Sequence, residues 1–93
     1  MNKLYLYNEQ THHQIEVNHI CQRLYNHLAS LYRENGAIRA TVKHIADGVG
    51  ISESGARFWM LIMKDAAVIT MDRHGKYFDI TVNEAVSFIT TPS

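Results

Sequence analysis

The first residues of the chain alternate between two sides. Over residues 3–7, Leu4 and Leu6 fall on one side and Tyr5 and Tyr7 on the other. This period of two is typical of a β-strand. The polar residues 8–13 that follow predict a turn.

The apolar spacing then changes to three and four, as on one face of a helix. The stripe consists of Val17, Ile20, Leu24, Leu28 and Leu31. Thr11 and Gln14 match a capping box at the start of this helix. Asn35 and Gly36 both tolerate the left-handed conformation of a C-cap. We therefore predict a long helix that ends at about Glu34.

Three further residues widen the apolar arc of this helix. Cys21, Tyr25 and Tyr32 lie beside the leucine stripe, and together they exceed the width that one packing partner covers. The width predicts a second contact surface on the helix.

Two shorter helices are predicted next, after a short bridge-like strand at residues 37–39. Thr41 can cap a helix over 42–49, and Gly50 suits a tight turn. Ser52 can cap a third helix of roughly fourteen residues, with Glu53 placed favourably against the helix dipole. The expected inner face of the third helix carries Ala56, Trp59, Met60, Met63 and Ala67.

The end of the chain reads as a hairpin followed by a short helix. Residues 68–71 and 77–80 are strand candidates around a loop at 72–76 that contains Gly75. Thr81 and Glu84 match a second capping box, which predicts one or two helical turns through Ile89. We expect the tail from Thr90 to Ser93 to fray.

Residues 45–59 resemble the helix-turn-helix of bacterial regulators. Ala46 is small where the next helix crosses, Gly50 permits the sharp bend, and Ile51 with Ser52 forms the step into the third helix. The order helix, short strand, helix, helix, hairpin is similar to the winged helix-turn-helix superfamily over about residues 15–82.

This resemblance implies an α+β fold in one domain over residues 1–93. Its three-helix core would carry a C-terminal two-stranded wing, and an extra N-terminal strand and a short C-terminal helix would flank it. In that family the third helix enters the major groove and the hairpin loop contacts the backbone or the minor groove of DNA.

Carried over by position, the resemblance implies a set of DNA-contacting residues. They are Lys43, His44, Ser52, Ser54, Gly55, Arg57, Arg73, His74 and Lys76, with Glu53, Phe58 and Leu61 also facing the groove. Arg57 is the strongest base-reading candidate because a guanidinium can pair with guanine O6 and N7. Ser54 and the free helix N–H groups suit a phosphate or a base edge, and the loop cations suit phosphates.

The third helix departs from the family pattern at Phe58, Leu61 and Ile62. These apolar residues lie away from its predicted core face, and three together suit contact with protein better than with thymine methyl groups. The expected interface with a second copy or another protein therefore comprises Leu4, Leu6, Tyr25, Tyr32, Phe58, Leu61 and Ile62.

Composition limits the function classes only in part. Nine basic and nine acidic residues cancel, so net charge does not by itself point to nucleic acid. The 46% apolar content excludes a disordered chain. Cys21 is the single cysteine, which fits a reducing cytoplasm. We expect no membrane association because no apolar run approaches the roughly 18 residues of a span.

Catalysis and metal binding find no support in the sequence. His12, Glu16 and His19 could share a helix face, but no Cys/His pair has a structural-zinc spacing. The chain has no phosphate-cradling glycine loop and no nucleophile elbow. We therefore expect no enzyme activity, no metal, no cofactor and no small-molecule substrate.

Three interpretations follow. The first is a homodimeric protein that binds double-stranded DNA sequence-specifically, a small transcriptional regulator. The second is a protein-binding module on the same scaffold, such as a phage or plasmid inhibitor or adaptor, which the neutral charge and the apolar third helix favour. The third, a plasmid partition or replication protein that binds repeated sites, is a subclass of the first.

Overall fold

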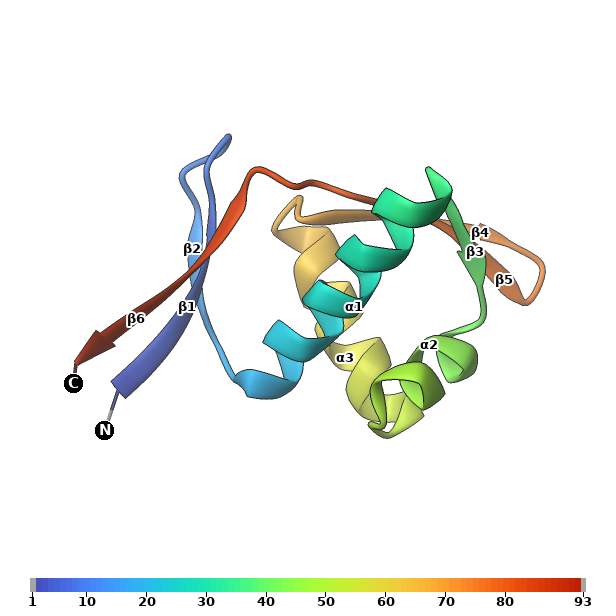
Figure 1. Ribbon diagram of the computed structural model, residues 1–93, viewed down its shortest axis with the longest axis horizontal. Coiled ribbons are helices and arrows are strands. Elements are labelled where there is room, and N and C mark those ends of the chain that lie inside the picture. The colour runs from blue at the N-terminus through green and yellow to red at the C-terminus, as the bar shows by residue number, and fades with distance from the viewer. Residues whose placement is uncertain (1, 93) are drawn as a thin grey trace.

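Three helices lie between two antiparallel sheets in the computed structural model, which describes residues 2–92 (Figure 1). In chain order the elements are β1 (Asn2–Asn8), β2 (Gln14–Val17), α1 (His19–Asn35), β3 (Ile38–Ala40), α2 (Val42–Val49), α3 (Glu53–Asp65), β4 (Ile69–His74), β5 (Tyr77–Val82) and β6 (Val86–Pro92). One sheet has the strand order β2-β1-β6 and the other β3-β5-β4. The α+β class and the expected N-terminal strand are thus confirmed.

The start of α1 differs from the prediction. The helix begins after Asn18, whose side chain accepts a hydrogen bond from the Cys21 backbone N–H, and not near Thr11. Ile15 and Val17 instead belong to β2, which pairs antiparallel with β1. Thr11 accepts a hydrogen bond from the His13 N–H within the turn. The hydroxyl therefore stabilises a turn between two strands, since the apolar residues behind it alternate with period two.

The C-terminal helix predicted over 81–89 is wrong. Thr81 lies in β5, and residues 86–92 form β6, which pairs along the whole of β1 from Asn2 opposite Pro92 to Asn8 opposite Val86. Pairing with β1 satisfies backbone groups that a fraying tail would leave to water. Thr90 to Pro92 are therefore ordered in a strand, and Ser93 lies outside the described residues.

The connection from α2 to α3 agrees with the prediction. Thr41 and Ser52 cap the two helices by accepting hydrogen bonds from the backbone N–H groups of His44 and Gly55. Gly50 between them has φ +82°, a left-handed conformation that only glycine adopts without strain. Gly36 ends α1 in the same conformation, with φ +71°.

The core lies between the helices and both sheets. Its largest fully buried apolar side chains include Leu6, Leu24, Leu28, Ile45, Met60, Met63, Val68, Ile69 and Ile80. Cys21 is fully buried while Ile20 is exposed, so the buried stripe of α1 is rotated from the predicted one. The prediction that Ala67 lies on the inner face of α3 is also wrong, because Ala67 follows this helix, is exposed and has φ +59°. Within residues 2–92, no helix is both long enough and apolar enough to span a membrane.

The wide apolar arc of α1 is covered by the chain itself. Tyr25 is buried, its hydroxyl donates to the Asn83 carbonyl at 2.7 Å, and its ring meets Phe88 of β6 edge-on at 5.5 Å. Leu6 is buried in the same core, and Leu4 and Tyr32 are half-buried against it. Contrary to the expectation, Leu6 and Tyr25 are therefore buried within the chain and are not available for contact with another one.

A buried asparagine joins β1 to the connection between α3 and β4. Asn8 is 1% exposed, and its amide nitrogen donates to the carbonyls of Ala66 at 2.9 Å and Ala67 at 3.3 Å. Its side-chain oxygen accepts from the N–H groups of Gln10 and Thr11. One side chain thus satisfies backbone groups of two segments that are far apart in sequence.

We predict that Asn8→Ala lowers the free energy of unfolding by about 2–3 kcal/mol, since it removes the four hydrogen bonds of a side chain that is itself 1% exposed. Urea unfolding followed by circular dichroism measures this loss. Asn35→Ala is the matched control because its exposed side chain bonds only to the Leu31 carbonyl, and it should change stability by less than about 0.5 kcal/mol. Equal unfolding midpoints for both variants would contradict the role assigned to Asn8.

Candidate functional site

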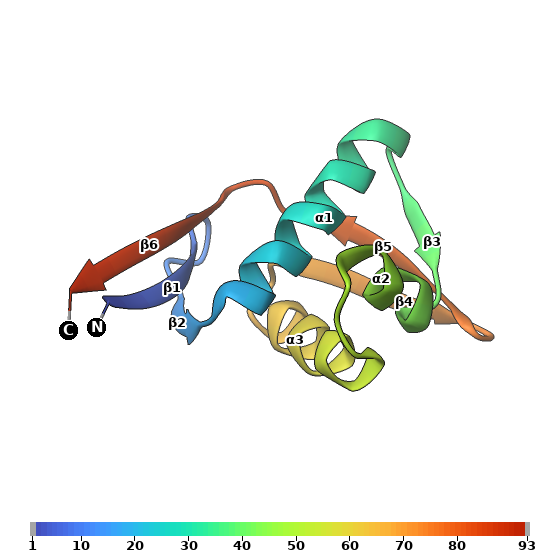
Figure 2. The same cartoon turned by 60° about the horizontal axis from the view of Figure 1, so that its bottom comes forward.

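Four basic side chains from three separate elements line one cavity. Lys43 comes from the start of α2, Arg57 from the first turns of α3, and Arg73 and Lys76 from the β4–β5 hairpin. The cavity has a volume of about 230 Å³, and its other lining residues are Thr41, Val42, Glu53 and Phe78. We call this arrangement the cationic cleft. Figures 1 and 2 place α2, the start of α3 and the turn of the β4–β5 hairpin on the side of the molecule opposite residues 2 and 92.

Local structure explains how α2 and α3 deliver their cations to the cleft. Thr41, the cap of α2, lines the cleft itself, so Lys43 follows two residues later at the helix start. The left-handed turn at Gly50 reverses the chain and starts α3 at Glu53. Arg57 lies one turn into α3, on the same side as Glu53, because residues four apart share a helix face.

Two of the four cations have carboxylate neighbours on their own helix. Lys43 lies 3.3 Å from Asp47, and Arg57 lies 3.3 Å from Glu53. Both pairs are solvent-exposed, where such ion pairs contribute at most about 1 kcal/mol. Either cation can therefore exchange its intrahelical carboxylate for an external anion at small cost.

The two hairpin cations are held by other means. Arg73 donates from Nε to the Gly75 carbonyl at 3.0 Å, and its guanidinium lies 6.0 Å from the Phe78 ring centre. Lys76 Nζ lies 5.4 Å from the Tyr77 ring centre. Neither forms an ion pair with a carboxylate of residues 2–92. These charges are available to an anion in the cleft.

Five of the residues expected at the site do not line the cleft. His44 lies at a different cavity, beside Leu31 and Ala37. The remaining ones are Ser52, Ser54, Gly55 and His74. Ser52 caps α3 through the Gly55 N–H, and its hydroxyl is 3.4 Å from that of Ser54. These serines lie at the start of α3, outside the cavity that gathers the cations.

His74 belongs to a charged cluster on the second sheet that sequence reasoning missed. Its Nε2 lies 3.0 Å from Asp79, which also accepts two hydrogen bonds from Arg39, at 2.7 and 3.0 Å. Hydrogen bonding from Arg39 holds the pKa of the Asp79 carboxyl below its usual range. Arg39 and Asp79 meet because β3 and β5 pair in this register, which no spacing along the chain reveals.

The outer face of α3 is apolar and exposed. The exposed fractions are 56% for Phe58 and 48% for Leu61. Ile62 is half-buried and lines a cavity of about 410 Å³ with Ile15 and Ala66. This face therefore runs from α3 to the edge of β2, and none of its residues line the cationic cleft.

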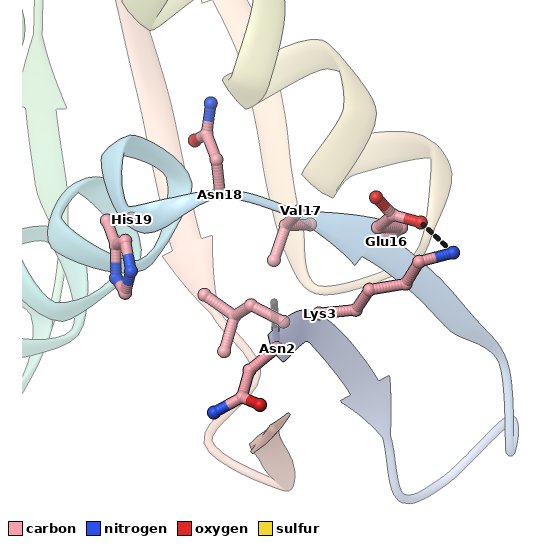
Figure 3. Close-up of a pocket in the computed structure, with 7 residues that line it drawn as sticks. Asn2, Lys3, Glu16, Val17, Asn18 and His19 are labelled. Atoms are coloured by element: carbon pink, nitrogen blue, oxygen red, sulfur yellow. Dashed lines mark ion pairs between the residues drawn. The ribbon is translucent and has the colours of Figure 1, made fainter. Parts of the chain in front are cut away.

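The histidines considered as metal ligands are not brought together. Figure 3 shows a cavity of about 290 Å³ in which Glu16 pairs with Lys3 at 3.9 Å, while His19 points away from that pair. His12 Nδ1 is 2.7 Å from the Tyr7 hydroxyl. In residues 2–92, no three His, Cys, Asp or Glu side chains are placed to share a metal ion.

Comparison of the chain with protein-family models, with curated proteins and with solved structures finds no match. Function is therefore inferred from the chemistry of the cleft and of the exposed faces.

We predict that Arg39→Ala raises the pKa of the Asp79 carboxyl, because two charge-assisted hydrogen bonds to its ionised form are lost. The carboxyl carbon shift of Asp79, followed by NMR between pH 2 and 7, gives this pKa. Lys3→Ala, which removes the partner of Glu16, is the control and should leave Asp79 unchanged. An Asp79 pKa that does not move in Arg39→Ala would show that Arg39 is not its main partner.

Proposed function

We propose that this chain binds double-stranded DNA sequence-specifically through a winged helix-turn-helix arrangement, as a small transcriptional regulator in the cytoplasm. Residues 19–82 run in the order helix, short strand, two helices and hairpin, which is the order that this arrangement requires. In this proposal α1, α2 and α3 are the three-helix core, α3 is the recognition helix, and the β4–β5 hairpin is the wing.

The observation that carries the proposal is the convergence of Lys43, Arg57, Arg73 and Lys76 on one cleft. The chain has as many acidic as basic residues, so a random distribution would not concentrate cations there. Glu53 is the only carboxylate among the residues that line the cleft. A concave surface with this charge favours a polyanion through release of its counterions.

The four cations have different chemical roles in this proposal. Lys43, Arg73 and Lys76 contact phosphates, which position the duplex without reading its sequence. Arg57 projects from α3, the element that would enter the major groove, and its planar fork suits the O6 and N7 atoms of guanine. Arg57 would then exchange its exposed contact with Glu53 for the base.

A second candidate function is binding to another protein through the apolar face of α3. The exposure of Phe58 and Leu61 favours it, because a recognition helix that only reads DNA is expected to present polar or basic side chains. Phe58 and Leu61 do not line the cleft, so variants of Lys43, Arg73 and Lys76 separate the two functions.

We predict that the double variant Arg73→Ala, Lys76→Ala weakens binding to any duplex. The plot of log K against log salt should also become less steep by about 2, because each of the two lost phosphate contacts contributes about −0.9 to its slope. Fluorescence anisotropy with a labelled duplex between 50 and 300 mM salt measures both quantities. Arg33→Ala is the control, because Arg33 is an exposed arginine of α1 paired with Glu84. Absence of binding to any duplex at about 50 mM salt would contradict the DNA proposal and favour the second candidate.

Arg57→Ala tests base reading separately. We expect a loss of about 1–3 kcal/mol on a duplex selected from a random pool by the wild-type chain, and a smaller loss on an unselected duplex. Competition titrations with both duplexes give the ratio of the two affinities. Equal losses on both duplexes would assign Arg57 to the phosphates and leave base reading to other residues.

A further inference from the structure

The two sheets have four edge strands, and one of them differs from the others. The edges are β2 and β6 in the first sheet and β3 and β4 in the second. β2 carries Glu16, β3 carries Arg39, and β4 carries Asp72 and Arg73. β6, at seven residues, is the longest of the four and has no charged side chain. Charges, prolines and shortness are the usual means by which an edge strand avoids pairing with another chain, and the proline of β6, Pro92, is its last residue.

No other part of the described chain covers the free edge of β6. Its one neighbour in the sheet is β1. In both Figure 1 and Figure 2 β6 lies on the outer side of this sheet, and no helix or loop runs along it. A row of backbone N–H and C=O groups is thus open to a further strand.

The sequence of β6 is compatible with pairing to itself. An antiparallel pair centred on Ile89 places Ile89 opposite its own counterpart and Phe88 opposite Thr90 of the second copy. Because the strand is uncharged, this register brings no like charges together. Ile89 also lies beside Tyr5 of β1 on the same face, so the pairing would form a row of apolar side chains across four strands.

We propose that two copies of this chain join through antiparallel pairing of their β6 strands about a two-fold axis at Ile89. The product is a continuous six-stranded sheet in the order β2-β1-β6-β6-β1-β2. This interface replaces the one expected from the sequence, in which Leu6 and Tyr25 took part. It leaves the cationic clefts at the far sides of the dimer, and it does not depend on what those clefts bind.

The first test is a covalent one. Directly opposed residues of antiparallel strands have Cα atoms about 4.5–5.5 Å apart, within the range that a disulfide spans. Under mild oxidation at about 10 μM, Ile89→Cys should form a disulfide-linked dimer on a non-reducing gel. Cys21 does not compete, because it is fully buried and burial raises its pKa to about 12. Leu61→Cys, on the exposed face of α3, is the control and should remain a single chain.

The second test uses charge. Ile89→Lys and Ile89→Glu each place like charges opposite one another across the axis, so each alone should have the mass of one chain by light scattering at about 100 μM. An equimolar mixture should recover the mass of two chains, because lysine then faces glutamate. Circular dichroism checks that each variant is folded, and recovery in the mixture is a result that a misfolded variant cannot give.

Three results would overturn the proposal. The first is a wild-type chain with the mass of one chain at about 100 μM. The second is efficient linkage of Leu61→Cys with none of Ile89→Cys, which would place the interface on α3. The third is a dimer that persists in both charged variants alone.

Discussion

The hydrogen bonds of Asn8 hold the first sheet in its place against the rest of the molecule. Its amide reaches the carbonyls that follow α3, while its oxygen orders the turn that leads into β2. Asn83 adds a second link by donating to Gln10 and to the Ala67 carbonyl. Because β1 lies between β2 and β6, the position of both outer strands follows from this contact. β6 then covers Tyr25 of α1 by packing Phe88 against its ring.

The side of the molecule that carries the cleft is organised by helix ends and by one turn. Capping by Thr41 and Ser52 and the left-handed Gly50 are local features, so the bounds of α2 and α3 could be predicted from the sequence. Lys43, Arg57, Arg73 and Lys76 were each predicted as candidates, but the sequence left open whether they share one face, which the β4–β5 hairpin decides by bringing its turn back to the starts of α2 and α3. Phe78 could not be predicted at the site, since its place depends on the pairing of β5 with its neighbours.

The errors of sequence reasoning lie where two local patterns compete. Thr11–Gln14 and Thr81–Glu84 both match a capping box, yet both are followed by short segments that form strands. A capping box stabilises a helix by about 1 kcal/mol, whereas a strand that closes over Leu6 and Tyr25 buries whole apolar side chains. Tertiary burial is the larger effect, and it is invisible until β1 and β6 are known to meet.

The pairing of β1 with β6 places Asn2 opposite Pro92, so it joins segments that are far apart in sequence. Contacts between residues so far apart in sequence carry a large loop-closure entropy and form slowly. On the ribosome, β1 and β2 emerge before β6, so their sheet lacks its third strand until residues 86–92 have been made. The helices and the β4–β5 hairpin can assemble before then from neighbouring segments. We therefore expect closure of the sheet β2-β1-β6 to follow assembly of the helices and the β4–β5 hairpin.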